Sequence, residues 1–141
     1  MRTLIFSTVL SAILAVQASG EDKPKKHPID AKVEAAEEKA MSTVEQMEVQ
    51  TNGLKLWDAE MNRVYAKLKK RLKPSTFEAL QAAQRDWLKY RDSQTRFINE
   101  MYQQFQGTMY IPMRAAAELE ITRARALELT HLLEVYEEAA E

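Results

Sequence analysis

Polar side chains that could carry chemistry lie on one face of a segment near the middle of the chain. Residues 77–105 have helical periodicity, and the apolar stripe of this segment carries Gln84, Arg91 and Thr95 beside Trp87. A guanidinium on a face that looks towards a core is costly to bury without a carboxylate. We therefore expect Arg91 to have partners on other elements.

Two other helical segments supply candidate partners for this polar layer. Asn62 and Tyr65 lie in the middle of the preceding helical segment, and Thr122 and Arg125 lie in the last one. In an antiparallel bundle these side chains can meet at one level, with Asp58 or Asp92 as the carboxylate that each arginine requires.

Two interpretations of the layer remain open. The favoured one is a polar network that sets the register of the helices, a role for which buried polar groups have precedent. The alternative is a ligand-binding groove lined by Trp87, Tyr65 and Arg91.

Nothing else in the sequence supports catalysis, a cofactor or a metal. The histidines, His27 and His131, lie in an expected linker and near the end of the last helix, without metal-ligand spacing around them. The three glycines form no phosphate-binding loop, and no serine has a credible histidine partner. We expect a protein that is not an enzyme, with no catalytic residues, cofactor or metal.

The composition fits one folded helical domain. The chain has 141 residues, of which 45% are hydrophobic and 29% charged, and its formal net charge is −1. This balance argues against a nucleic-acid partner.

The N-terminus predicts export. Residues 1–18 combine Arg2, an apolar run over residues 4–16 and a small-residue cleavage site ending at Ala18, with cleavage after Gly20 as a second possibility. The run is short for a membrane span, so an uncleaved anchor is the less favoured alternative. The chain has no cysteine for lipidation or disulfides. We expect a bacterial periplasmic or secreted protein without a membrane span after cleavage.

The sequence after residue 18 predicts a linker over residues 19–29 and one helical domain over residues 30–141. Asp30 is the expected N-cap of a short helix to about residue 40. Ser42 and Glu45 have capping-box spacing and begin a helix to about residue 72, in which Asn52-Gly53 allows a kink or break. The core stripe of that helix comprises Leu54, Trp57, Met61, Tyr65, Leu68 and Leu72, with Val64 on its flank.

Two further helices follow. Ser75 and Glu78 form a second expected capping box after Pro74, and Gly107 is the expected C-cap of that helix. Pro112 suits the first turn of the last helix. The fold class predicted is all-α: an elongated antiparallel bundle of three long helices plus a short N-terminal helix, without strands.

Three motifs in order carry a family resemblance. The segment Asp58–Tyr65 resembles D-x-x-L-N-x-x-Y, Gln84–Asp92 resembles Q-x-x-W-x-x-x-R-D, and Thr122–Leu129 resembles T-x-x-R-x-x-x-L. Over residues 30–136 the chain resembles the LprI-type family, small secreted bacterial proteins with a lysozyme inhibitor LprI-like N-terminal domain. Met61 replaces the usual leucine, and Ala36 and Val49 stand where many relatives carry cysteines.

The resemblance implies an all-helical fold, export and, for the member that gives the family its name, lysozyme inhibition. It supplies no catalytic or inhibitory residues. The matched positions form a family-signature core: Asn62, Tyr65, Gln84, Trp87, Arg91, Asp92, Thr122 and Arg125.

Two classes of function follow. The first is an exported binding protein that inhibits a lysozyme-type muramidase through a partner-binding loop, comprising Thr108, Met109, Tyr110 and Ile111, and through an acidic tail over residues 134–141. The loop could instead only cap the bundle. The alternative is a structural or interaction module of the envelope without an enzyme target, self-associating through Val64, Phe97 and Met101. A carrier of a small ligand at the Arg91 layer is a third hypothesis.

Overall fold

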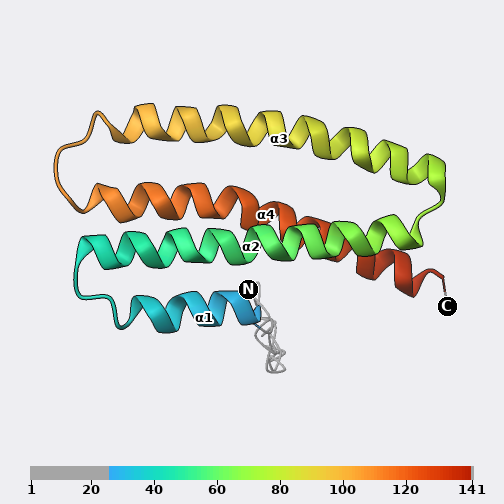
Figure 1. The fold of residues 1–141 in the computed structure, drawn as a ribbon, viewed down its shortest axis with the longest axis horizontal. Coiled ribbons are helices and arrows are strands. Elements are labelled where there is room, and N and C mark those ends of the chain that lie inside the picture. Colours follow the sequence, from blue (N-terminus) through green and yellow to red (C-terminus); the bar gives the residue numbers. More distant parts are fainter. Residues whose placement is uncertain (1–25, 141) are drawn as a thin grey trace, which may run out of the picture.

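The fold is an all-α bundle of four helices (Figure 1). The computed structural model describes residues 26–140, so the expected signal peptide and most of the expected linker lie outside the described residues. The helices are α1 (Pro28–Glu37), α2 (Thr43–Arg71), α3 (Pro74–Tyr102) and α4 (Tyr110–Glu138). Within this range there is no strand. The predicted fold class is confirmed.

The core lies between α2 and α4. Successive helices are antiparallel, so α2 and α4 run in the same direction and lie side by side (Figure 1). Residues with at most 6% of their surface exposed line this contact: Trp57, Met61, Val64 and Leu68 from α2, and Leu119, Thr122, Ala126, Leu129 and Leu133 from α4. Val64, expected on the flank of the stripe, is at its centre.

The outer helix α3 is packed more loosely than its periodicity predicts. Ile98 is its only buried residue, whereas Leu80 and Trp87 are half-buried against the core. The stripe over residues 77–105 is therefore not a core face along its whole length. The reason is that α2 and α4 bury most of their apolar surface against each other, and α3 covers only the seam between them.

The helix starts show which capping predictions hold. The capping box of Ser42 and Glu45 is confirmed: the Ser42 hydroxyl accepts a hydrogen bond from the Glu45 amide at 3.2 Å, and the Glu45 carboxylate accepts one from the Ser42 amide at 2.9 Å. Backbone donors, first that of Met41, lower the pKa of Glu45.

The caps expected at Asp30 and Ser75 are wrong. The N-cap of α1 is His27, and that of α3 is Lys73; each helix begins on the following proline. Proline has a fixed φ suited to the first helical position and lacks the amide hydrogen that would be unpaired there. Pro28, Ile29 and the cap His27 thus belong to the first helix, although they were expected in the linker.

The expected C-cap at Gly107 is also wrong, because α3 ends at Tyr102 with Gln103 as its C-cap. Gly107 lies farther along the connection and has a φ of 119°, which non-glycine residues rarely adopt. Pro112 lies in the first turn of α4, as predicted.

The turn-prone pair Asn52-Gly53 does not interrupt α2. Gly53 is buried, and a Cβ built on it would lie 2.6 Å from Leu119 Cδ1 and 2.9 Å from Val33 Cγ2. The glycine therefore allows α1 and α4 to approach α2 closely.

A long-range ion pair holds α1 on the bundle. Arg123 Nε and Nη2 each donate to the Asp30 carboxylate at 2.8 Å, and the Arg123 guanidinium lies 5.6 Å from the Trp57 ring centroid. The His27 ring stacks on the same indole at 4.5 Å. These contacts tie the start of α1 to the centre of both α2 and α4.

This ion pair predicts a pH-dependent contribution to stability. Hydrogen bonds from Arg123 hold the folded-state pKa of Asp30 below its ordinary value of 3.8. A lowered carboxyl pKa stabilises the fold above the ordinary value, and the contribution is lost as the pH falls through the folded-state pKa. We expect Asp30→Asn to lower the free energy of unfolding by about 1–2 kcal/mol at pH 7.

The measurement is denaturant unfolding of both proteins across pH 2–7. The difference between them should shrink as the pH falls below the ordinary pKa of 3.8, because Asp30 of the unfolded wild type takes up a proton first and that of the folded protein follows at lower pH. A difference that stays constant down to pH 2 would mean that the charge of Asp30 contributes nothing.

Candidate functional site

The polar layer joins all three long helices through two groups of contacts. Its first half centres on Arg91 of α3, whose guanidinium lies 3.3 Å from Asp92 and 3.9 Å from Asp58 of α2. Asn62 donates to the same Asp58 carboxylate at 3.2 Å. The Arg91 guanidinium also lies 5.4 Å from the Trp87 ring centroid. Both expected carboxylates therefore face Arg91.

The second half centres on Gln84, between α2 and α4. Its side-chain oxygen accepts a hydrogen bond from Arg125 Nε at 3.0 Å, and its amide nitrogen lies 3.5 Å from the sulfur of Met61. Arg125 pairs with Glu128 at 2.7 Å, so the expectation of Asp58 or Asp92 as its carboxylate is wrong. Arg125 and Glu128 are three residues apart, which places them on one face of α4.

The eight signature residues are thus spread over more than one turn of the helices, and they differ in burial. Thr122 is buried, whereas Tyr65, Gln84, Trp87, Arg91 and Arg125 are half-buried, and Asn62 and Asp92 are exposed. Tyr65 stacks on Phe77 at 5.5 Å rather than joining the hydrogen bonds. That the layer sets helix register stays a prediction.

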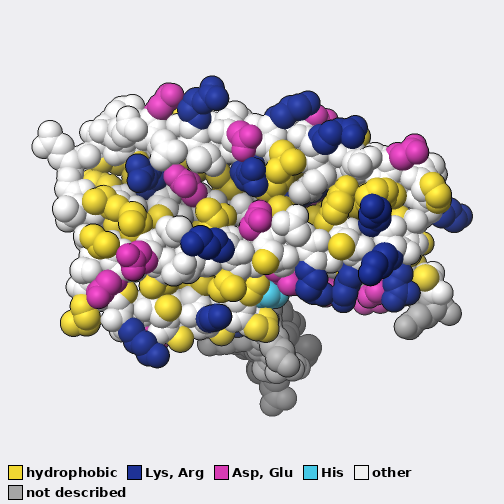
Figure 2. Space-filling view, in the orientation of Figure 1, with side chains coloured by type: hydrophobic (Ala, Val, Ile, Leu, Met, Phe, Trp, Pro, Cys, Tyr) yellow, Lys and Arg dark blue, Asp and Glu magenta, His cyan; other side chains and the backbone are white. Residues whose placement is uncertain are grey.

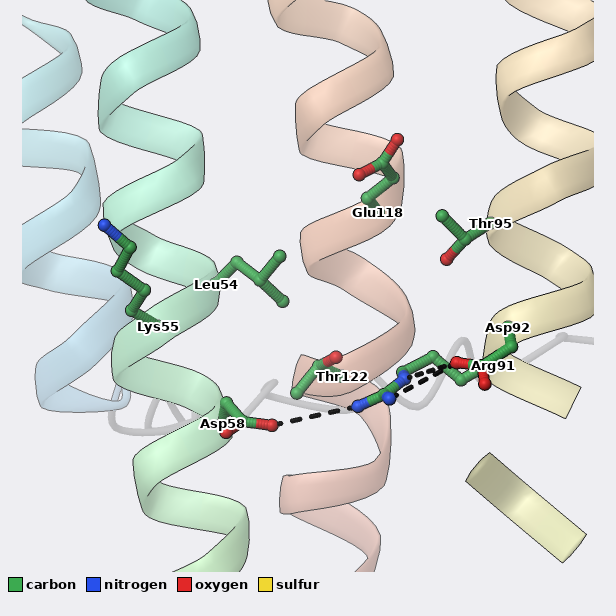
Figure 3. Close-up of a pocket in the computed structure, with 8 residues that line it drawn as sticks. All are labelled: Leu54, Lys55, Asp58, Arg91, Asp92, Thr95, Glu118 and Thr122. Atoms are coloured by element: carbon green, nitrogen blue, oxygen red, sulfur yellow. Dashed lines mark hydrogen bonds and ion pairs between the residues drawn. The ribbon is translucent and has the colours of Figure 1, made fainter. Parts of the chain in front are cut away.

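A groove runs along the seam beneath α3. One part, of about 530 Å³, is lined from α2, α3 and α4 by residues that include Leu54, Arg91, Glu118 and Thr122 (Figure 3). A second part, of about 440 Å³, lies next to it and shares Asp58 and Arg91 with the first. The Arg91–Asp58 ion pair therefore stands between two parts of one groove.

The predicted partner-binding loop has a different outline in the structure. The connection from α3 to α4 covers residues 103–109, so Tyr110 and Ile111 belong to the first turn of α4. Thr108, Met109 and Ile111 are exposed, whereas Tyr110 is half-buried. Tyr110 therefore helps to pin the connection rather than project from it.

Aromatic stacking fixes the shape of this connection. The ring of Phe105 lies 5.6 Å from that of Tyr102 and 5.0 Å from that of Tyr110, so residues from both helix ends pack together. The positive φ of Gly107 turns the chain back towards α4. A shaped connection presents Met109 in a defined position.

The neighbouring connection between α1 and α2 extends this exposed apolar surface. Both connections lie at the same end of the bundle (Figure 1). Met41 is 89% exposed and Met109 is 59% exposed. A shallow groove lined by Gln46, Gln50, Met109 and Met113 lies where the start of α2 faces the start of α4. We name this end the apolar tip: Met41, Phe105, Met109, Ile111 and Met113.

The apolar tip also carries negative charge. Residues 34–48 contain five glutamates and one lysine. Hydrophobic side chains are visible at this end in Figure 2, as they are elsewhere on the face, whereas Lys and Arg side chains gather towards the other end of α2.

The acidic tail is a weaker candidate than the tip. It lies against the basic end of α2, where Glu137 is 3.6 Å from Arg71 and the Tyr136 hydroxyl donates to the Arg71 carbonyl at 3.0 Å. Neighbouring positive charge therefore offsets part of the negative charge of the tail.

The face expected for self-association is only partly available. Val64 is fully buried between α2 and α4, so its assignment to a dimer face is wrong. Phe97 is 56% exposed, and Met101 is half-buried.

Sequence reasoning missed Met41 and Met113 as parts of the tip, and it missed the groove. Methionines near helix starts give only a weak sequence signal for an exposed apolar surface. A groove depends on how far apart the packed helices lie, and the sequence does not show that distance. Within residues 26–140, no group of three His, Asp or Glu residues could hold a metal ion. In the same part of the chain, no helix is both long and apolar enough to cross a membrane.

Comparisons with known proteins agree with the fold. The model of the family described as "Lysozyme inhibitor LprI" matches residues 34–129. A crystal structure of an uncharacterized protein from Burkholderia thailandensis is similar, with a TM-score of 0.74 and 27% sequence identity. The match covers 80% of this chain and 57% of that one, so the chain spans little more than half of that protein. No curated protein matches the chain significantly.

Proposed function

The chain belongs to the lysozyme inhibitor LprI family, and from this premise we propose that it is an exported binding protein, not an enzyme, that inhibits a lysozyme-type muramidase. Export rests on the signal-peptide pattern of residues 1–18, and the periplasm or the medium is the proposed location. The family name supports an inhibitor rather than a catalyst.

The observation that carries the proposal beyond the family name is the apolar tip. Monomeric proteins seldom expose grouped large apolar side chains without a partner. Met109 and Met113 line one groove, and the exposed Met41 belongs to the connection at the same end of the bundle. Methionine side chains adapt to irregular surfaces, which suits insertion into an enzyme cleft.

The charge beside the apolar tip also supports the tip as the surface that contacts the muramidase. Lysozyme-type muramidases are commonly basic, and the tip adjoins the glutamate-rich residues 34–48. Opposite charge on the two partners steers their encounter and raises the association rate. Inhibition should therefore weaken as the ionic strength rises.

The test is a cell-wall lysis assay with purified protein and muramidases of several types. We expect Met109→Ala to raise the inhibition constant roughly tenfold, because it removes an exposed apolar anchor from the centre of the tip. Leu132→Ala is the matched control: Leu132 is 47% exposed on α4, the helix that Met109 precedes, and lies roughly 35 Å from Met109 at 1.5 Å per residue.

The possible results test the proposed inhibition and the position of its contact surface separately. Absence of inhibition at molar excess over every muramidase would contradict the proposed function. Inhibition that Met109→Ala and Leu132→Ala leave equally strong would place the contact elsewhere than the tip.

A further inference from the structure

The groove beneath α3 has no role in muramidase inhibition through the tip, and it contains an unexplained polar group. Thr122 is 1% exposed, lines the groove, and its hydroxyl has no hydrogen-bond partner. Figure 3 shows its side chain beside the Arg91–Asp58 ion pair, in the middle of the lining residues.

Two other helical threonines, Thr51 and Thr130, behave differently. The hydroxyls of Thr51 and Thr130 each donate to the carbonyl four residues earlier at 2.9 Å, the usual way for a helical threonine to satisfy its hydroxyl. A buried hydroxyl without a partner costs about 1–3 kcal/mol. An unpaired hydroxyl at the floor of a groove indicates a position where a ligand can supply the missing bond.

The ion pair beside Thr122 can open at low cost. Arg91 is 32% exposed on its side chain, and its distance to Asp58 is 3.9 Å, near the upper limit for a salt bridge. Partly exposed ion pairs contribute little, typically at most about 1 kcal/mol. Displacing the Arg91 guanidinium would join the two parts of the groove and expose Thr122.

The charges of the groove give no net preference for a simple anion or cation. Its two parts contain three positive side chains, of Lys55, Arg85 and Arg91, and three negative ones, of Asp58, Asp92 and Glu118. Positive and negative groups therefore balance, and they supply donors and acceptors in similar number.

The remaining lining favours a saccharide over a peptide. Amide side chains of Asn62, Gln81 and Gln84 add further donors and acceptors, and Tyr65 and Leu88 add apolar surface. Sugar rings need this combination, because each hydroxyl both donates and accepts while the C–H faces are apolar. A peptide that binds as an added strand needs a free sheet edge, which helical walls do not provide.

We propose that the groove beneath α3 binds an uncharged oligosaccharide, with Thr122 as a buried hydrogen-bonding group and Arg91 as a displaceable cover. The site is separate from the apolar tip, and the proposal does not depend on muramidase inhibition. Two sites on one chain would let the protein hold a glycan while the tip remains free for a protein partner.

The experiment is a titration of isotope-labelled protein followed by amide chemical shifts, with no muramidase present. The probes are chitotetraose, cellotetraose and, as the rival ligand, an uncharged tetrapeptide. We expect saturable shifts with at least one sugar at residues lining the groove. Thr122→Val should weaken binding roughly three- to tenfold, the value of one hydrogen bond.

Thr122→Val is suited to this test because valine has nearly the same shape and lacks the unpaired hydroxyl. Its melting temperature should be unchanged or higher, so weaker binding could not be attributed to unfolding. Thr130→Val is the matched control, since Thr130 lies on the same helix and is not among the groove-lining residues; it should bind sugar as the wild type does.

Several results would overturn the proposal. They are the absence of saturable shifts with both sugars at millimolar concentration, shifts centred outside the groove, and saturation by the peptide alone. Equal affinity of Thr122→Val and wild type would remove Thr122 from the site and overturn it as well.

Discussion

Replacing Trp57 by alanine should lower the free energy of unfolding by about 3–5 kcal/mol, a large part of the 5–15 kcal/mol typical of a domain. The indole is 1% exposed: it lies in the α2–α4 contact, the His27 ring packs on it, and the Arg123 guanidinium lies over it. Denaturant unfolding followed by helical circular dichroism measures the loss.

Two controls show whether the loss belongs to this position. Trp87→Ala makes the same change on α3, where the side chain is only half-buried, and should cost clearly less. Trp57→Phe keeps an aromatic ring and removes an indole N–H that has no hydrogen-bond partner, so it should also cost less than alanine. An equal cost for Trp57→Ala and Trp87→Ala would contradict the loose packing of α3.

Helical periodicity predicted the bundle but not the closeness of its contacts. The stripe on α2 is buried as expected because Trp57, Met61 and Leu68 repeat at helical spacing. The stripe on α3 has the same spacing, yet Trp87 and Leu88 remain partly exposed. Periodicity indicates which face of a helix is apolar, and it contains no information on how many neighbours share that face.

The capping rules predicted the start of a helix correctly where no other residue nearby could begin that helix first. Ser42 and Glu45 form their capping box because both partners lie within one turn. Asp30 and Ser75 fail as caps because Pro28 and Pro74 start their helices first. Asp30 instead pairs with Arg123, 93 residues away, and no local pattern predicts such a contact.

The candidate sites also divide into features that local sequence predicts and features that only the assembled fold creates. The polar layer of Gln84, Arg91 and Arg125 could be predicted because each is an unusual residue on an apolar stripe. The apolar tip could be predicted only from its α3–α4 side. Met41 belongs to it because the chain reverses between α1 and α2 at the same end of the bundle, which is a property of the assembled fold.

Gly53 shows most clearly how a sequence signal changes meaning in the fold. The pair Asn52-Gly53 allowed a kink, and α2 is instead continuous, with Gly53 beneath Val33 of α1 and Leu119 of α4. The glycine weakens the helix by about 1 kcal/mol relative to alanine, and the close packing of three helices offsets that cost. A larger side chain should therefore stabilise the isolated helix and disrupt the assembled bundle.

We expect Gly53→Val to lower the free energy of unfolding by about 1–3 kcal/mol or more, the usual cost of overpacking a core. The added Cβ alone would lie within 3 Å of both Val33 and Leu119, and the stiff branched side chain of Val33 has little room to move. Because α1 is the shortest helix, it should be displaced first, and limited proteolysis should cut near Val33 before the rest of the chain.

Two variants separate crowding from helix propensity. Gly53→Ala should cost less than valine, because a gain of about 1 kcal/mol in propensity offsets its smaller clash. Ala59→Val places valine on the exposed face of the same helix and should cost at most about 0.7 kcal/mol. If Gly53→Val is as stable as wild type and α1 stays protected, close packing over Gly53 does not limit the size of this side chain, and α1 is held by its other contacts, among them Asp30–Arg123 and His27–Trp57.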